Sequence, residues 1–394
     1  MIANVPVILI VLACIGFQVL KGRLTKSFVN LVVALIAGVI AFNYFEVLAE
    51  VFLSRSGNSR WPAVIPWTQT LSFSFLFVFA FAALRGGISK LLNNDIEFSM
   101  LVERIGRGVC GFFLGLFLSG ILLTAVMMSP FQYERFSGTN PDPDQPNTSF
   151  LNADGFATGL FSLFSKGSMS GGKSFAVVHP DYLDQLAMNR LNDSGNIKVF
   201  TTRNIIDVPS EKAVWPGPEN LSSETGSPIQ PEPDAELMIV RVGISKSALS
   251  GGAFSFTPSQ LRIIVKPDGE NGRGLSGTGR NVYPVGYFSG PGQVATPSLR
   301  QTITLRSDDF EKNVKWIDFL FSVPLNHTPV LVELKQNNIA ELPAETKAEE
   351  APRNLDNSQT EVRSIASSSS AASASSRTRR IRSVIRRLSC SCIS

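Results

Sequence analysis

Cysteine, histidine and charged side chains are all scarce in this sequence. The 394 residues include four cysteines and two histidines, which are too few for a disulfide-dense scaffold and make a structural zinc site a poor fit. Charged residues make up 17%, against about a quarter in soluble domains, and the mean hydropathy is +0.14. We therefore expect no resident cofactor or metal, and the shortage of charge indicates a membrane protein.

Four long runs in the first third contain no charged side chain at all. They cover residues 2–20, 28–45, 67–84 and 108–128. At helical rise each run extends about 27–32 Å, which is the thickness of a bilayer core. We predict an all-α transmembrane domain over residues 1–128, a bundle of four helices. Because the runs lack ionisable groups, an ion-coupled carrier acting alone is disfavoured.

Basic residues gather in two of the three connections between these runs. The first and third connections hold seven of them: Lys21, Arg23, Lys26, Arg85, Lys90, Arg104 and Arg107. The second connection holds only Arg55 and Arg60. Since Lys and Arg in short loops remain cytoplasmic, both chain ends are predicted to lie outside the cytoplasm.

The membrane domain resembles the colicin V production protein (CvpA) family over roughly residues 5–128. Two segments carry the resemblance: Lys21-Gly22-Arg-Leu-Thr-Lys26-Ser-Phe between the first two runs, and Val102-Glu-Arg-Ile-Gly-Arg-Gly-Val-Cys-Gly-Phe-Phe-Leu-Gly115 at the last. The acidic-Arg pair typical of the family falls on Glu103 and Arg104, and its acidic position is commonly Asp. The resemblance implies a bacterial inner-membrane protein tied to colicin V production or export, and to envelope homeostasis. It implies no catalytic residue.

Small residues recur four apart in two of the runs. Ala34 and Gly38 lie in the second run, and Gly111 and Gly115 lie in the fourth. Such pairs let two helices approach closely. They favour either packing within one bundle or a homo-oligomer interface, and we regard the first interpretation as the simpler one.

The remaining 266 residues divide by composition. We expect a linker at 129–148, a mixed α/β segment at 149–207, a proline-rich linker at 208–235, and a disordered basic tail at 341–394. Residues 236–340 contain runs rich in Val, Ile, Phe and Tyr between Gly, Pro, Ser and Asn clusters. The predicted strands are 237–244, 261–265, 281–288, 301–305, 316–321 and 329–334, which suggests a small immunoglobulin-like sandwich.

One motif matches the phosphate loop of nucleotide hydrolases. Gly167, Gly172, Lys173 and Ser174 stand at the required spacing. The loop should lead into a helix, yet Pro180 follows six residues after Ser174 and would end that helix early. A Ser/Gly turn is the better interpretation, and an NTPase is kept as the weakest alternative.

The two histidines are far apart in the sequence. His179 precedes Pro180, and His327 lies two residues before Pro329. We predict that each lies at a turn. Without a nucleophile motif near either ring, we predict no catalytic site.

Two functions remain open. The first is a non-enzymatic accessory protein of the inner membrane that takes part in export or envelope maintenance. The second is an envelope-anchoring or ligand-binding module on a passive membrane base. Both hypotheses make the lipid bilayer a partner and the β domain the surface for an envelope protein or polymer, and neither involves nucleic acid.

Reporter fusions test the predicted orientation. We expect alkaline phosphatase fused after Met128 or after Ala340 to be active, because the basic connections hold the opposite side of the membrane in the cytoplasm. A cytoplasmic reporter at the same two positions should be inactive. The reverse pattern at both positions would overturn the orientation.

Overall fold

The computed structural model describes most of the chain. It covers residues 4–56, 64–91, 98–130, 150–166, 174–192, 197–201, 203–218, 221–269, 275–290 and 293–345. Of the linker predicted at 129–148, only residues 129–130 are described. Of the basic tail predicted at 341–394, only residues 341–345 are described. Together these ranges are the described residues of the protein.

The apolar runs form long helices. These are α1 (Asn4–Lys21), α2 (Leu24–Ser56), α3 (Thr68–Leu91) and α4 (Met100–Met128), and the 3-10 turn η1 (Ile65–Trp67) precedes α3. Three of them, α2, α3 and α4, are long and apolar enough to cross a membrane, and α1 is a shorter apolar helix. The structure therefore confirms a helical membrane region, with three such spans in its described part rather than the predicted four.

Helix α2 is longer than the apolar run that predicted it. The run ends at Phe45, whereas the helix continues through Glu46 and Glu50 to Ser56. At 1.5 Å per residue its 33 residues cover about 50 Å, well beyond a bilayer core. The last turns of α2 therefore extend past the apolar layer toward the sheets.

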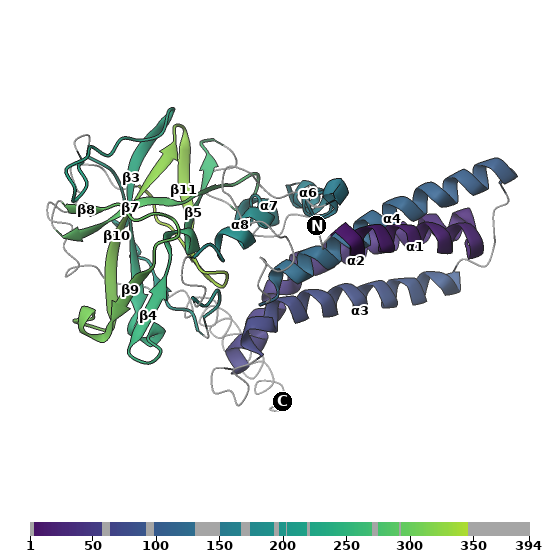
Figure 1. The fold of residues 1–394 in the computed structure, drawn as a ribbon, viewed down its shortest axis with the longest axis horizontal. Coiled ribbons are helices and arrows are strands. Elements are labelled where there is room, and N and C mark those ends of the chain that lie inside the picture. The colour runs from purple at the N-terminus through teal and green to yellow at the C-terminus, as the bar shows by residue number, and fades with distance from the viewer. Residues whose placement is uncertain are drawn as a thin grey trace, which may run out of the picture.

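The helix connections rich in basic residues lie at one end of the molecule. Figure 1 shows the α1–α2 connection and the start of α4 at the end of the helices far from the sheets. The end of α2 and the start of α3 lie at the near end, beside the sheets. The sheets and the basic connections are thus on opposite sides of the helical region.

Glycines allow α1 and α4 to pack with their backbones in contact. A Cβ added at Gly115 would lie 2.7 Å from Val11 Cα, and one added at Gly111 would lie 2.9 Å from Ile15 Cα. Both glycines face α1 of the same chain, as the within-bundle interpretation predicts. Gly38 on α2 faces Phe117 of α4 and Phe161 of a later helix, so it too is used within the chain.

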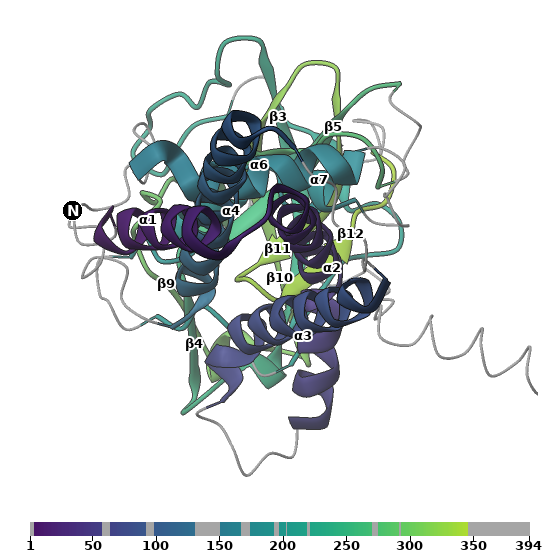
Figure 2. The same ribbon diagram turned by 90° about the vertical axis from the view of Figure 1, so that its right-hand side faces the viewer.

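Short helices separate the long helices from the sheets. They are η2 (Phe150–Asn152), α6 (Ala153–Lys166), α7 (Phe175–Val178) and α8 (Tyr182–Met188). Helix α6 crosses the bundle axis, and α7 and α8 lie between it and the strands (Figures 1 and 2). Aromatic rings of Phe42, Phe161 and Phe175 meet at this level, with centroids 4.4 and 5.3 Å from Phe42. This apolar cluster joins α2, α6 and α7.

The β region consists of antiparallel strands in three sheets. Its strands are β1 (Ile206–Asp207), β2 (Val214–Pro216), β3 (Ala235–Ser245), β4 (Ala253–Phe256), β5 (Leu261–Pro267), β6 (Arg280–Val282), β7 (Pro284–Gly290), β8 (Gln293–Ala295), β9 (Ile303–Arg306), β10 (Val314–Pro324), β11 (His327–Leu334) and β12 (Asn338–Glu341). The largest sheet has the order β1-β3-β10-β7-β8, and β2 also pairs with β3. A second sheet has the order β12-β11-β5-β6, and β4 pairs with β9. The core between them contains apolar side chains from all three sheets.

Strands β3 and β10 pair along their whole length and hold one buried ion pair. Asp318 lies directly opposite Arg241, which donates from Nε and Nη2 to its two carboxylate oxygens at 2.7 and 2.9 Å. The guanidinium carbon also lies 5.2 Å from the Trp215 ring centroid. Trp215 belongs to β2 and is fully buried, so part of the segment interpreted as a proline-rich linker contributes to the sheet core.

Most predicted strands are confirmed, with two differences. The run at 281–288 is divided into β6 and β7, because the chain leaves regular pairing at Tyr283. Strands β1, β2, β4, β8 and β12 have no counterpart among the predicted runs; all but β4 and β12 are two or three residues long, and such short runs carry little periodic signal. The structure shows an antiparallel β-rich region and does not establish an immunoglobulin-like topology.

Close α1–α4 packing predicts that two glycine-to-alanine substitutions in α4 change the stability of the protein differently. Gly115→Ala should destabilise the protein by about 1–3 kcal/mol, because the new methyl group meets the α1 backbone. Gly108→Ala meets nothing within 4 Å and should be neutral or slightly stabilising through helix propensity. Thermal unfolding in detergent measures both, and equal effects would contradict this packing.

Candidate functional site

A histidine and a glutamate meet where the long helices reach the sheets. Glu46 lies on α2 just after the apolar run, and His179 ends α7 immediately before Pro180. The His179 Nε2 atom is 2.8 Å from Glu46 Oε1. About 33 Å of helix separates Glu46 from Leu24 at the other end of α2, so this pair lies just beyond a bilayer core. His179 is buried, whereas 37% of the Glu46 side chain is exposed.

The pair is the first link of a longer polar network. His179 Nδ1 is 2.9 Å from Gln185 Oε1 on α8, and Gln185 Nε2 donates to Glu333 Oε1 on β11 at 2.8 Å. The other Glu333 oxygen pairs with the Arg262 guanidinium on β5. Gln185, Glu333 and Arg262 are all almost completely buried. A continuous series of polar contacts therefore runs from a membrane helix into the second sheet.

Hydrogen-bond donors and acceptors determine the charge of His179. The Glu333 carboxylate accepts, so the Gln185 amide must present its nitrogen to Glu333 and its oxygen to His179. His179 then has an acceptor at each ring nitrogen, the Gln185 oxygen and the Glu46 carboxylate. Both ring nitrogens can donate only in the imidazolium form, which this arrangement of acceptors favours. With both carboxyl groups ionised and His179 protonated, the network alternates in charge from Glu46 through His179 and Glu333 to Arg262.

Burial and charge act in opposite directions on the pKa of His179. Burial lowers the pKa, but the attraction of Glu46, its hydrogen bond and the more distant Glu333 outweigh burial, so the pKa is raised above 6.5. Rings of Phe175 and Tyr182 lie 5.1 and 4.9 Å from the imidazole and exclude water. For Glu333, burial raises the carboxyl pKa more than Arg262 and His179 lower it.

The Arg262 end of the network holds α7 and α8 against the second sheet. Arg262 Nη2 donates to the Val178 carbonyl at 2.9 Å, and Nη1 donates to Asn281 on β6. Asn281 Nδ2 donates to the Pro180 carbonyl at 2.5 Å. The backbone on both sides of His179 is thereby fixed. Among the described residues, the buried Arg262 Nε and Tyr283 hydroxyl groups have no hydrogen-bond partner, and burial raises the Tyr283 pKa.

A second contact joins the sheets to α3. Gln69 Nε2 donates at 3.2 Å to the carbonyl of Gln336, which lies in the turn between β11 and β12. Both side chains are buried. The second sheet and its connecting turn are therefore bonded directly to α3, and to α2 through His179 and Gln185.

These contacts join the helices to the second sheet and include a titratable histidine. Within the described residues, no group of three or more His, Cys, Asp and Glu side chains could hold a metal ion. The network includes no serine or cysteine as a nucleophile. The titratable histidine of this network is His179, whose pKa is raised.

The residues singled out for topology and family resemblance lie at the opposite end of the helices. Arg107 Nη1 donates to the carbonyls of Gly22 and Val19, at 2.7 and 3.2 Å, and so caps the end of α1. Its Nε donates to the Glu103 carbonyl one turn earlier. The structure thus brings Gly22 and Arg107 together, while Arg23, Lys26 and Arg104 are exposed. Lys21 ends α1, and its side chain is not described.

Most of the phosphate-loop motif lies outside the described residues. Gly167, Gly172 and Lys173 fall in that gap. Ser174 is buried and donates from Oγ to the Ser165 carbonyl at 2.9 Å. Helix α7, which follows it, has only four residues. The Ser174 hydroxyl therefore joins the end of α6 to the start of α7.

The sequence patterns miss the central residues of the network. They predict a turn without a role for His179 and do not single out Gln185, Glu333 or Arg262. A signal is present, because Arg262 and Glu333 each interrupt an otherwise apolar strand. A charged residue within a buried strand needs a partner, but nothing local identifies which one.

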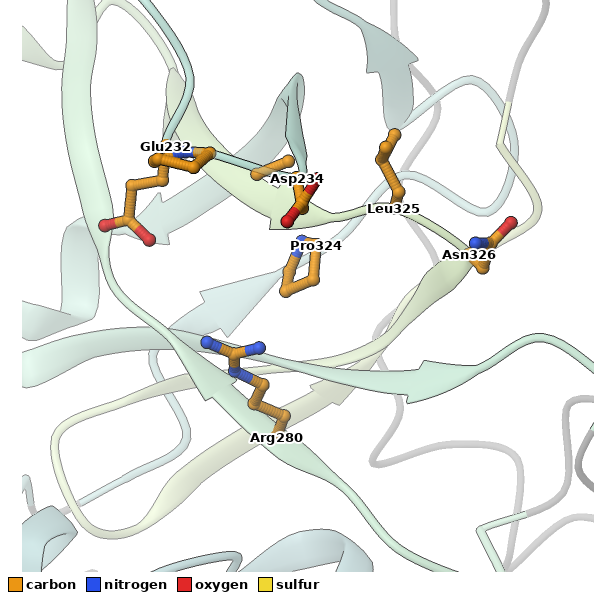
Figure 3. A pocket seen from close by; sticks show the side chains of 8 residues that line it. Glu232, Asp234, Arg280, Pro324, Leu325 and Asn326 are labelled. Atoms are coloured by element: carbon orange, nitrogen blue, oxygen red, sulfur yellow. The ribbon is translucent and has the colours of Figure 1, made fainter.

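An open pocket lies elsewhere in the β region, where several strands end. It has a volume of about 480 Å³ and is lined by Glu232, Pro233, Asp234, Ala235, Arg280, Pro324, Leu325 and Asn326. Figure 3 shows Arg280 reaching up from one wall, with Glu232 and Asp234 on the other side. All three charged side chains are exposed, so this pocket lacks the buried polar groups of the junction.

No protein-family model, curated protein or solved structure matches this chain. The assignment of a role therefore depends on the geometry of the junction and the helices.

The raised His179 pKa predicts a definite pH dependence. Folding binds the imidazole proton more tightly, so this stabilisation is complete below pH 6.5 and is lost as pH rises through the raised value. Glu46→Gln removes the attracting charge and should flatten this part of the stability profile. We expect a loss of about 1 kcal/mol at acidic pH, small because Glu46 is over a third exposed.

Glu50→Gln is the matched control, since Glu50 is exposed one turn further along α2. Thermal unfolding of both variants across the pH range measures the difference. Parallel profiles for the two variants would contradict the assigned role of Glu46.

Proposed function

We propose that this protein is a non-enzymatic accessory protein of the bacterial inner membrane, in which the membrane helices and an extracytoplasmic β region act as one unit. It crosses the membrane four times, with α1 as the fourth span. The β region stands outside as a sandwich-like module that contacts an envelope protein or polymer. The resemblance to the colicin V production family supports a role in toxin export or envelope homeostasis.

The position of the basic residues supports this orientation. Arg107 and the residues around Gly22 form one end of the helices, and the sheets lie at the other end. The positive-inside rule assigns the first end to the cytoplasm. Helix α1 is about 27 Å long over its 18 described residues, and it runs beside α4. That length suits a fourth crossing with a modest mismatch to the bilayer.

The observation that carries the proposal is the network from Glu46 to Arg262. A β domain on a passive anchor needs only a tether, and a tether requires no buried charges. Here two buried charges and a buried histidine link α2 to the second sheet, at a considerable desolvation cost. This junction supports a function in which the state of the helices is transmitted to the β region, or the reverse.

The alternative is a ligand-binding module on a passive base. The pocket at Arg280 favours it, since that pocket offers both signs of charge to a polar ligand. In this case the pocket would determine activity, and the junction would serve stability alone.

Chromosomal variants in a bacterium that carries the chain distinguish the two functions. The readouts are toxin release into the medium and resistance of the envelope to detergent. Glu46→Gln combined with His179→Gln should reduce both, while the amount of protein in the membrane remains that of the parent. Glu50→Gln is the control and should be silent.

The alternative predicts a different pattern. Arg280→Ala would then abolish activity, and the Glu46 and His179 variant would retain it. That pattern, at equal protein levels, would reject the proposed coupling.

A further inference from the structure

Helix α6 carries an apolar edge that is partly exposed within the described residues. Phe156, Leu160, Leu163 and Phe164 follow the i, i+4, i+7, i+8 pattern of one helix face. Leu163 is 64% exposed and Phe164 is 38% exposed. Phe156 and Leu160 are half-buried. Within the described residues, the main contacts of α6 are with α2, α4, α7, α8 and η2. Phe156 also packs against the apolar cluster that includes Val7 and Val11 of α1.

The opposite side of α6 is firmly packed on the long helices. Ala157 and Phe161 are buried among side chains of α2 and α4. The Phe161 ring stacks on Phe42 with centroids 4.4 Å apart, and the absence of side chains at Gly38 and Gly120 lets α6 approach both helices closely. This packing fixes which way the remaining faces point.

The apolar edge of α6 and the side of α6 that contacts α7 lie on opposite sides of its packed face. At 100° per residue, Ser165 lies on one side of the face formed by Ala157 and Phe161, and Leu160 and Leu163 lie on the other. Ser165 accepts from the Ala176 amide at 2.9 Å and so marks the side toward α7. The apolar edge therefore points away from α7 and the sheets. Half-buried Ser162 lies on the side of Ser165, about 60° from it, and the exposed Lys166 lies opposite the packed face, about 60° from Leu163.

The depth of α6 along the bundle matches the outer boundary of a bilayer. From Arg107 to Gly120, where α4 meets α6, the helix rises about 20 Å. On α2, Tyr44 is 58% exposed and lies about 30 Å from Leu24, where an interfacial aromatic residue is expected. Gly38, which meets α6, lies about 9 Å before Tyr44. An amphipathic helix in a membrane interface is buried to about 5–10 Å.

We propose that α6 is an in-plane membrane helix whose apolar edge is covered by lipid on the side of the membrane that faces the sheets. Its 14 residues reach about 21 Å, too short to cross the bilayer, and it lies across the spans (Figure 2). On α1, Val5, Leu9 and Leu12 are exposed as well. The inference rests on the membrane placement in the proposed function, but not on the export role or on which side is outside.

The contact with lipid reaches the charge network through one short connection. Ser174 Oγ donates to the Ser165 carbonyl, so the end of α6 is bonded to the start of α7. His179 lies at the other end of that four-residue helix. A shift of α6 in the lipid would therefore move the backbone that carries His179.

Tryptophan substitutions test where the edge points. Leu163→Trp and the control Ser162→Trp are compared in nanodiscs of phosphatidylethanolamine and phosphatidylglycerol, with the parent's four tryptophans as the baseline. Neither position belongs to the core, so both variants should fold. We expect Leu163→Trp to add blue-shifted emission that brominated acyl chains quench, and Ser162→Trp to add emission that aqueous acrylamide quenches.

Two results would overturn the proposal. Acrylamide quenching of Leu163→Trp equal to that of Ser162→Trp would place the edge in water. Protection of Leu163→Trp from both quenchers would indicate that another protein surface, such as a second copy, covers it. Failure of the proposed function would instead appear as unchanged toxin release in the Glu46 and His179 variant, which this fluorescence does not measure.

Discussion

The contact between Glu46 and His179 is the constraint on which the arrangement of helices and sheets depends. It joins a residue just beyond the apolar part of α2 to a residue that ends a four-residue helix. Gln185 bridges His179 and Glu333. Its amide nitrogen donates to Glu333, and its amide oxygen faces the His179 ring. Glu333 in turn neutralises Arg262, which holds the carbonyl before His179. Removal of any member leaves a buried charge or a buried donor without its partner.

Packing within the membrane follows a different principle from packing at the junction. Between α1 and α4 the helices gain contact by omitting side chains at Gly111 and Gly115, so that backbones meet. At the junction the chain instead uses large polar and aromatic side chains, among them His179 and Tyr182. The helix contact at the glycines involves no titratable group. The contact at the junction includes His179, whose charge depends on pH. The two ends of the same helices therefore respond to different conditions.

The local patterns of the sequence predict the long elements well and the junction poorly. Apolar runs identify the long helices, and strands such as β3 and β10 follow from runs of Val, Ile and Phe, because these patterns are complete within a few residues. Glu46 and His179 are 133 residues apart, and Gln185 and Glu333 are 148 apart. No periodicity connects such positions. Trp215 shows the same limit, since its surrounding prolines indicate a linker while its ring packs in the β3 sheet.

The turn at Gln336 has a consequence for how the molecule is made. Helices are inserted as the chain is synthesised, and α3 with Gln69 is complete long before β11 and the turn after it appear. Until then the Gln336 carbonyl that Gln69 binds has not been synthesised, and neither has Glu333, the ion-pair partner of Arg262. These two contacts are therefore completed only when the C-terminal strands of the β region are present. A chain that ends before β11 would lack both the Gln69 contact and the Arg262 ion pair.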